Sequence, residues 1–174
     1  IRLTPPPYDF GNPPRCETSK ITSFYKLIFC YLNRSSKLIV FVYNWYMKKI
    51  YVNLPVINLE KSTAFYEALG FTKNSDFSNN DASCMVWSDN ILFMLLKHDF
   101  YQKFLQGKTI ANTQINSGVL LALEMSSKED VDKFASIAKN NGGSFFEAEP
   151  NKGLDFMYGL EVSDPDGNTM EPFF

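Results

Sequence analysis

The sequence predicts an α+β fold in which two βαβββ modules close around a cleft. The last two thirds of the chain repeat one order of elements: an apolar strand pattern, a helical pattern that stops at glycine, and three short apolar runs. A single module of this kind cannot cover both faces of its own sheet, so we expect the two copies to pack together. The cleft between them is where we expect function.

The first module is predicted over residues 49–98. Its expected strands are Ile50–Val56, Phe71–Asp76, Ala82–Ser88 and Ile91–Lys97. The helix is predicted over Leu59–Leu69, because its apolar residues recur at helical spacing. That stripe consists of Leu59, Ala64, Phe65, Ala68 and Leu69. Asn58 is a suitable N-cap, and Gly70 can take the left-handed conformation that ends a helix.

The second module is predicted over residues 117–174, after a linker at 99–116 that holds a short helix over Asp99–Gln106. Its expected strands are Val119–Met125, Ser144–Glu149, Met157–Ser163 and Asn168–Phe174. Its helix spans Lys128–Lys139, with Ser126 and Glu129 at capping-box spacing. The apolar stripe consists of Val131, Phe134, Ala135 and Ala138. A turn is predicted at Asp164–Gly167.

Residues 1–46 differ in composition from the rest of the chain. They hold all three arginines and carry a net charge of +4, whereas the chain from Met47 onward has eleven lysines against 17 acidic residues, a net charge of −6. Met47-Lys48-Lys49-Ile50 resembles an ordinary bacterial start. We therefore interpret residues 1–46 as a non-native or disordered upstream extension and exclude them from fold reasoning. The alternative is a genuine N-terminal extension with one added strand over Lys37–Tyr46.

Composition restricts the function of the single domain predicted at residues 47–174. Its acidic balance gives it no electrostatic footprint for nucleic acid or an anionic membrane. Without arginine, it also lacks a bidentate clamp for phosphate or carboxylate groups. No run in the chain reaches the ~20 apolar residues that a bilayer requires. Cys84 is the one cysteine of this domain and has no disulfide partner there, which favours a reduced, cytoplasmic setting.

Two segments resemble the vicinal oxygen chelate superfamily, which includes glyoxalase I, extradiol dioxygenases and the fosfomycin and bleomycin resistance proteins. Val52–Phe71 is similar to the first strand and helix of that superfamily, and Val162–Glu171 to its last hairpin. The resemblance covers Lys49 to Phe174. It implies an incomplete, barrel-like cleft with the helices outside, but it does not specify an activity, because this fold hosts lyases, oxygenases, transferases and binding proteins.

The resemblance also implies four positions for the ligands of a divalent metal, one on each of four strands. Metal-dependent members place histidine or glutamate there, whereas this chain has Tyr51, Met94, Leu120 and Glu171. Only Glu171 is of the expected type, and hard cations need several oxygen or imidazole ligands. We therefore expect a degenerate metal site and no cofactor. A divalent metal centred on Glu171 remains the alternative.

Alternation along the strands predicts which residues line the cleft. The candidate ligand-binding residues are Tyr51, Asn53, Trp87, Met94, Leu120, Glu124, Tyr158, Glu171 and Phe173. This lining is apolar and aromatic, with a few carboxylates and no basic group, so it suits an apolar or cationic small molecule. Glu171 is the one catalytic candidate. His98, the only histidine, lies beyond a strand end, and Cys84 is interpreted as a small core residue.

Two functions of different class follow. The first is a small-molecule binding protein similar to the bleomycin resistance proteins, and we expect it to be a homodimer, because clefts in this superfamily often form between subunits. The second is a metal-dependent enzyme, similar to a glyoxalase lyase or a dioxygenase, in which Glu171 is joined by Glu124, Tyr51 or a residue of the partner subunit. A protein whose ligand has yet to be found is the third possibility. Metal content and ligand screening discriminate the first two.

Overall fold

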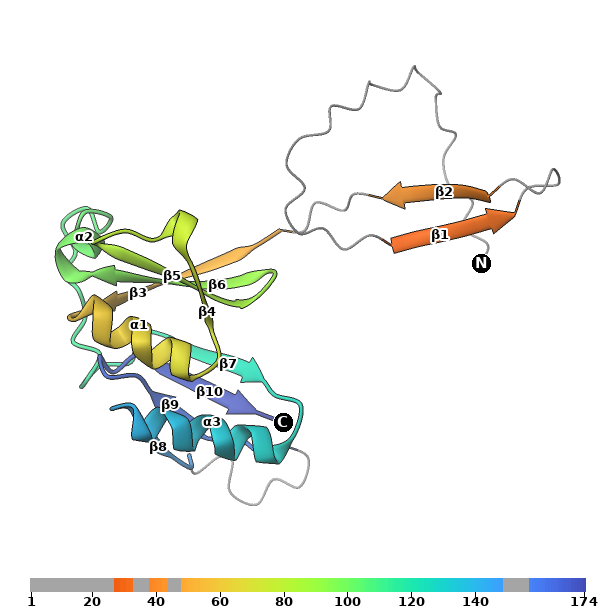
Figure 1. Ribbon diagram of the computed structural model, residues 1–174. Coiled ribbons are helices and arrows are strands. Elements are labelled where there is room, and N and C mark those ends of the chain that lie inside the picture. The colour runs from red at the N-terminus through yellow and green to blue at the C-terminus, as the bar shows by residue number, and fades with distance from the viewer. Residues whose placement is uncertain (1–26, 33–37, 44–47, 149–156) are drawn as a thin grey trace, which may run out of the picture. The chain divides into compact units, whose positions relative to one another are not determined.

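The computed structural model describes residues 27–32, 38–43, 48–148 and 157–174, and the chain divides into two compact units, residues 1–46 and 47–174. In the first unit, strands β1 (Leu27–Leu32) and β2 (Leu38–Tyr43) pair in antiparallel fashion (Figure 1). β2 lies within the segment that the alternative interpretation predicts as a strand. Whether residues 1–46 are native or an upstream extension stays a prediction.

The second unit contains two four-stranded sheets built to one plan. The first sheet has the order β3-β6-β5-β4 and the second β7-β10-β9-β8, so equivalent strands take equivalent places. In each sheet the first strand of the module pairs in parallel with the last strand, and the other pairings are antiparallel. Over residues 48–148 and 157–174, the two sheets are separate and form no closed barrel. The predicted α+β fold with a duplicated module is confirmed.

Strands β3, β5 and β6 have the predicted bounds, whereas β4, β8 and β9 are three-residue strands within longer predicted runs. The first module comprises β3 (Ile50–Val56), α1 (Leu59–Ala68), β4 (Thr72–Asn74), the 3₁₀ helix η1 (Ser75–Phe77), β5 (Ala82–Ser88) and β6 (Ile91–Lys97). The linker holds α2 (His98–Gln102), and the second module comprises β7 (Leu120–Glu124), α3 (Lys128–Asn140), β8 (Ser144–Phe146), β9 (Glu161–Ser163) and β10 (Thr169–Phe173). The strand predicted over Ser144–Glu149 corresponds to β8, and its predicted last residue, Glu149, lies outside the described residues.

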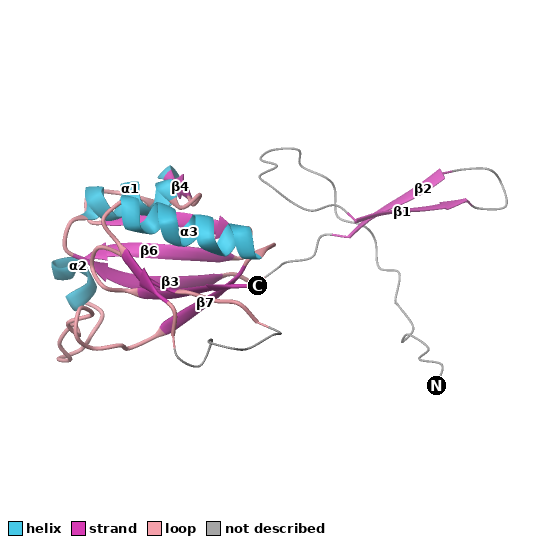
Figure 2. Ribbon diagram, turned by 90° about the horizontal axis from the view of Figure 1, so that it is seen from below, coloured by secondary structure: helices cyan, strands magenta, loops and turns pink. Residues whose placement is uncertain are grey.

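Helices α1 and α3 lie on the same side of the strands (Figure 2), and one hydrophobic core fills the space between the helices and the strands. Leu54 and Val56 of β3 and Val162 of β9 are fully buried in it. Aromatic rings contribute edge-to-face contacts, as between Phe65 and Tyr66, whose ring centroids lie 5.4 Å apart. Both modules contribute residues to this one core, so each module needs the other to bury its apolar residues.

The two helices differ in how well their apolar pattern predicts their buried face. All four predicted residues of α3 are buried. In α1 the predicted Ala64 and Ala68 are exposed, and Ser62, Thr63 and Tyr66 are buried instead. These three carry hydroxyl groups, so apolar periodicity alone does not find them; each is buried because its hydroxyl has a partner in the fold.

The predicted helix ends are confirmed in part. Asn58 caps α1 by accepting a hydrogen bond from the backbone N–H of Lys61, and Gly70 has φ = +96° beyond its last residue. The predicted cap of α3 is wrong by one residue. Ser127, rather than Ser126, accepts from the backbone N–H of Asp130, because the chain enters the helix one residue later than the capping-box spacing suggests.

The turn between β9 and β10, defined as residues 164–168, ties the second module to the first. Asp166 accepts from the backbone N–H of Ile57 at 2.8 Å and from the Ser62 hydroxyl at 2.7 Å, both at the start of α1. Asp164 accepts from the Tyr66 hydroxyl at 3.0 Å. The side-chain amide of Asn168 donates to the Pro55 carbonyl at 3.2 Å. The two acids and the amide are all buried, so these bonds are shielded from water.

The backbone of this turn packs closely against Thr113 of the linker. Asp164 Oδ1 accepts from the backbone N–H groups of Asp166 and Asn168, which closes the turn on itself. Gly167 has φ = +88°, and a Cβ there would lie 2.7 Å from the carbonyl carbon of Thr113. The Thr113 hydroxyl in turn donates to the Asp166 carbonyl. Only glycine combines this conformation with so close an approach.

We predict that Asp166→Ala lowers the free energy of unfolding by about 2–3 kcal/mol, because it removes the carboxylate that accepts from the Ile57 N–H and the Ser62 hydroxyl. Asp89→Ala is the matched control, since Asp89 is exposed in the equivalent turn of the first module, between β5 and β6. We expect the control to change the free energy by no more than about 0.5 kcal/mol. Urea unfolding followed by circular dichroism measures both, and equal losses would contradict the proposed tie.

Candidate functional site

The candidate site is the cleft face, which we define as the face of each sheet turned away from α1 and α3. Strand register places the predicted residues side by side on it. In the first sheet, Tyr51 pairs with Leu92 and Asn53 with Met94. In the second sheet the corresponding pairs are Leu120 with Thr169, Ala122 with Glu171, and Glu124 with Phe173. Side chains of paired residues share one face, so each sheet presents one continuous row.

Exposure differs along these rows. Tyr51 is 43% exposed and Leu120 48% exposed, and Asn53 and Glu124 are also exposed. Met94, Glu171 and Phe173 are half-buried. The accessible part of the cleft face therefore combines a phenol, an amide, carboxylates and apolar groups.

The sequence analysis missed Glu161, which the structure brings beside Glu171. Met170 pairs with Val162 across β9 and β10, and the backbone N–H of Leu160 donates to the Pro172 carbonyl, so Glu161 lies opposite Glu171 on the cleft face. Glu161 is only 7% exposed. Burial raises its pKa, and the charge of Glu171 raises that pKa further. We call these two residues the carboxylate pair. The signal that could have identified Glu161 is the antiparallel pairing across the predicted turn at Asp164–Gly167, which sets Ser163 opposite Thr169 and Glu161 opposite Glu171.

Two of the predicted ligand-binding residues contact α3, on the other side of the sheets from the cleft face. Trp87 packs in the core against Phe71 and against Phe134 of α3, with ring centroids 4.8 and 6.1 Å apart. Tyr158 donates its hydroxyl to Asp132 of α3 at 2.6 Å, which raises the pKa of the phenol to about 12. Trp87 has the helix-facing parity of β5, and Tyr158 lies before β9 begins.

The residues at the four expected metal positions do not fit a divalent ion. Glu171 has a carboxylate neighbour in Glu161, but register places Ala122 beside it on the other side. Met94 lies between Asn53 and Cys84. Among the described residues, no three His, Cys, Asp or Glu side chains gather in one place. Two carboxylates supply fewer ligands than such ions take in proteins.

Cys84 and His98 are the two other residues that the sequence singles out. Cys84 is fully buried, and burial raises the pKa of its thiol, although the positive charge of Lys49 acts in the opposite direction. Lys49 is thus a basic group near the cleft face of the first sheet, where the sequence analysis expected none. His98 is exposed at the first position of α2.

Two cavities lie apart from the predicted ligand-binding residues. One, of about 820 Å³, lies between α1 and the first sheet. The other, of about 430 Å³, is lined by residues 113–117, by residues 142–144, by the turn between β9 and β10 and by Ser163 and Thr169 beside that turn. None of the nine predicted ligand-binding residues lines either cavity. The role of the cleft face as the binding site therefore stays a prediction.

Comparison with known proteins supports the resemblance. Residues 48–86 match the family model described as Bleomycin resistance protein-like N-terminal. A hypothetical protein from S. aureus has a similar structure, with 26% identity and a TM-score of 0.60, covering 74% of this chain and 95% of that chain. The comparison with curated proteins finds no match.

Two further solved structures carry functional names. A glyoxalase/bleomycin resistance protein/dioxygenase family enzyme from Burkholderia phytofirmans is 20% identical, with a TM-score of 0.59, covering 71% of this chain and 94% of that chain. A fosfomycin resistance protein from Listeria monocytogenes is 15% identical, with a TM-score of 0.53, covering 74% and 91%. At these identities the likeness concerns the fold.

The family match and the shared fold confirm the resemblance to the vicinal oxygen chelate superfamily. Residues 47–174 have its glyoxalase/bleomycin resistance-like fold. In the part of the chain that the structure describes, no helix combines the length and the apolarity needed to cross a bilayer.

We predict that Glu171→Gln lowers the pKa of Glu161, because it removes the like charge but leaves the burial unchanged. The raised pKa of the native protein implies that stability falls as the pH rises from the ordinary glutamate pKa through that of folded Glu161. This loss is expected to be smaller in the variant. Carboxyl ¹³C titration by NMR measures the pKa, with Glu129→Gln at an exposed position of α3 as the control. An unchanged Glu161 pKa would disprove the coupling.

Proposed function

We propose that residues 47–174 form a small-molecule binding protein with a degenerate metal site, whose cleft face binds an apolar, cationic molecule. The carboxylate pair carries the proposal. Two carboxylates side by side, one of them 7% exposed, repel each other and are poorly solvated. A ligand cation at this place relieves both penalties, whereas an anion increases them.

Other residues of the cleft face, on both sheets, support the same ligand class. Phe173 follows Glu171 by two residues on the same face, and Tyr51 is exposed on the cleft face of the first sheet. Aromatic faces attract cations, and the apolar side chains Met94 and Leu120 offer dispersion contacts to a flat ligand. Fosfomycin, which names one of the relatives, is an anion and suits this face less well than the bulky cation bleomycin.

We predict that 10-methylacridinium, a flat aromatic cation, binds more tightly than neutral acridine by about five- to tenfold, the effect of one charge interaction at a half-buried site. Glu171→Gln should reduce this preference, and Glu124→Gln, which removes an exposed carboxylate from the neighbouring strand, should reduce it less. Fluorescence titration at neutral pH measures the dissociation constants. Equal affinity for the two compounds would exclude a cation-selective site, and the absence of binding would leave the cleft-face proposal without its ligand class.

Metal binding tests the alternative, an enzyme similar to a glyoxalase lyase or a dioxygenase and centred on Glu171. The second carboxylate of Glu161 is the observation that favours it. Titration with Ni²⁺, Zn²⁺, Fe²⁺ and Mn²⁺ provides the test. Stoichiometric binding that Glu171→Gln abolishes would support the alternative over the binding protein. Weak binding that the variant leaves unchanged would argue against it.

We also propose that the protein is a homodimer. Large apolar side chains are exposed on the second sheet, with Leu120 at 48% and Phe146 at 59%. Apolar groups of this size favour burial against a second copy. We predict a dimer mass in light scattering that Leu120→Glu shifts toward the monomer. Ile115→Glu, at a 78% exposed linker position, should leave it unchanged. A monomer at every concentration would contradict the proposal.

A further inference from the structure

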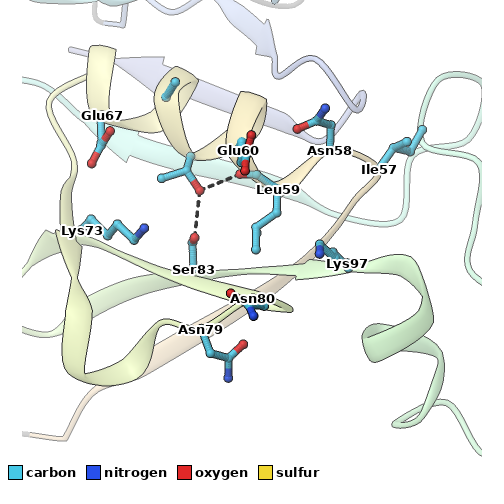
Figure 3. Close-up of a pocket in the computed structure, with 12 residues that line it drawn as sticks. Ile57, Asn58, Leu59, Glu60, Glu67, Lys73, Asn79, Asn80, Ser83 and Lys97 are labelled. Atoms are coloured by element: carbon cyan, nitrogen blue, oxygen red, sulfur yellow. Dashed lines mark hydrogen bonds between the residues drawn. The ribbon is translucent and has the colours of Figure 1, made fainter.

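A polar cavity lies on the helix side of the first module, away from the cleft face (Figure 3). Its volume is about 820 Å³, and its walls are α1 above and the strands β4, β5 and β6 with the loop before β5 below. Cavities of this size hold small organic ligands. Its position separates it from the carboxylate pair, which lies in the second module.

Two buried hydroxyl groups, of Thr63 on α1 and Ser83 on β5, line the cavity. Thr63 and Ser83 are 7% and 2% exposed, and their oxygens lie 2.8 Å apart. Thr63 has one hydroxyl proton, which it donates to the Leu59 carbonyl at 2.6 Å. The proton between the two oxygens therefore comes from Ser83. With that proton engaged, the free lone pairs of Ser83 are left to accept from a donor.

The charged residues of the cavity are divided between opposite walls. Glu60 and Glu67 belong to α1, whereas Lys73 belongs to β4 and Lys97 to β6. Figure 3 shows Lys73 reaching toward the centre below the helix that carries Glu67. Within the described residues, the only ion pair recorded for these four is Lys97 with exposed Asp81, at 4.0 Å. Acids and lysines therefore face each other across the cavity without pairing.

We propose that this cavity binds a small zwitterion with separated ammonium and carboxylate groups, such as an ω-amino acid or a short peptide. The ammonium lies toward the glutamates of α1 and the Ser83 oxygen, and the carboxylate lies toward Lys73 and Lys97. The side-chain amides of Asn79 and Asn80, on the same side as the lysines, add donors for the carboxylate. A ligand with one charge satisfies one wall only, so the cavity discriminates by charge pattern.

The test uses 6-aminohexanoate as the probe, with hexanoate and hexylamine as analogues that keep one charge each. Amide chemical-shift changes in the ¹⁵N-labelled full chain report the site and the affinity. We expect 6-aminohexanoate to bind with a dissociation constant near 1 mM, roughly what so small a ligand allows. The shifts should map to residues 57–67, 73, 79–83 and 97. Each singly charged analogue should bind at least about fivefold more weakly.

Substitutions at two exposed alanines of α1 provide a matched pair. Ala64 lines the cavity and Ala68 does not, so Ala64→Leu should weaken binding of the probe at least about fivefold by filling space, while Ala68→Leu should leave it unchanged. Lys73→Gln should remove the preference for 6-aminohexanoate over hexylamine. Equal binding of the three compounds, shifts that map elsewhere, or no shifts at all would each overturn the proposal.

Discussion

The carboxylates of Asp164 and Asp166, buried in the turn between β9 and β10, fix how the two modules meet. Burial raises the pKa of Asp164, while the bonds from Asn168 and Tyr66 act against that rise. Burying a carboxylate is costly unless every partner is present, so the network holds only one arrangement of the modules. Because the turn contacts both the end of β3 and the start of α1, it also sets the position of the first sheet relative to the second.

This constraint determines what the cleft face can contain. With α1 and α3 on one side of both sheets, alternate residues of every strand are assigned to the shared core, and the remainder are assigned to the cleft face. Glu161 and Glu171 fall on the cleft face, where no helix of this unit supplies a basic partner that the structure records. The fold therefore concentrates negative charge beside apolar groups, the combination that makes a cationic ligand the best chemical match.

The sequence predicts the duplicated module, the bounds of β3, β5 and β6 and the buried face of α3, because these follow local apolar periodicity. It fails for α1, where Ser62 and Tyr66 are buried through hydrogen bonds to residues about a hundred positions away. No local pattern contains that information. Trp87 and Tyr158 were expected to line the cleft from neighbouring strands, whereas both contact residues of α3.

The alternation of β5 and β6 also means that neighbouring residues serve different surfaces. Ser83 contributes to the floor of the polar cavity, whereas Cys84 lies in the row with Met94 on the cleft face. Lys97 borders the cavity, and Leu96 beside it pairs with Pro55 of the cleft-face row. Effects of substitutions along these strands must therefore be interpreted by parity rather than by proximity in sequence. Adjacent residues of one strand act on opposite sides of the sheet, whereas every second residue acts on the same side.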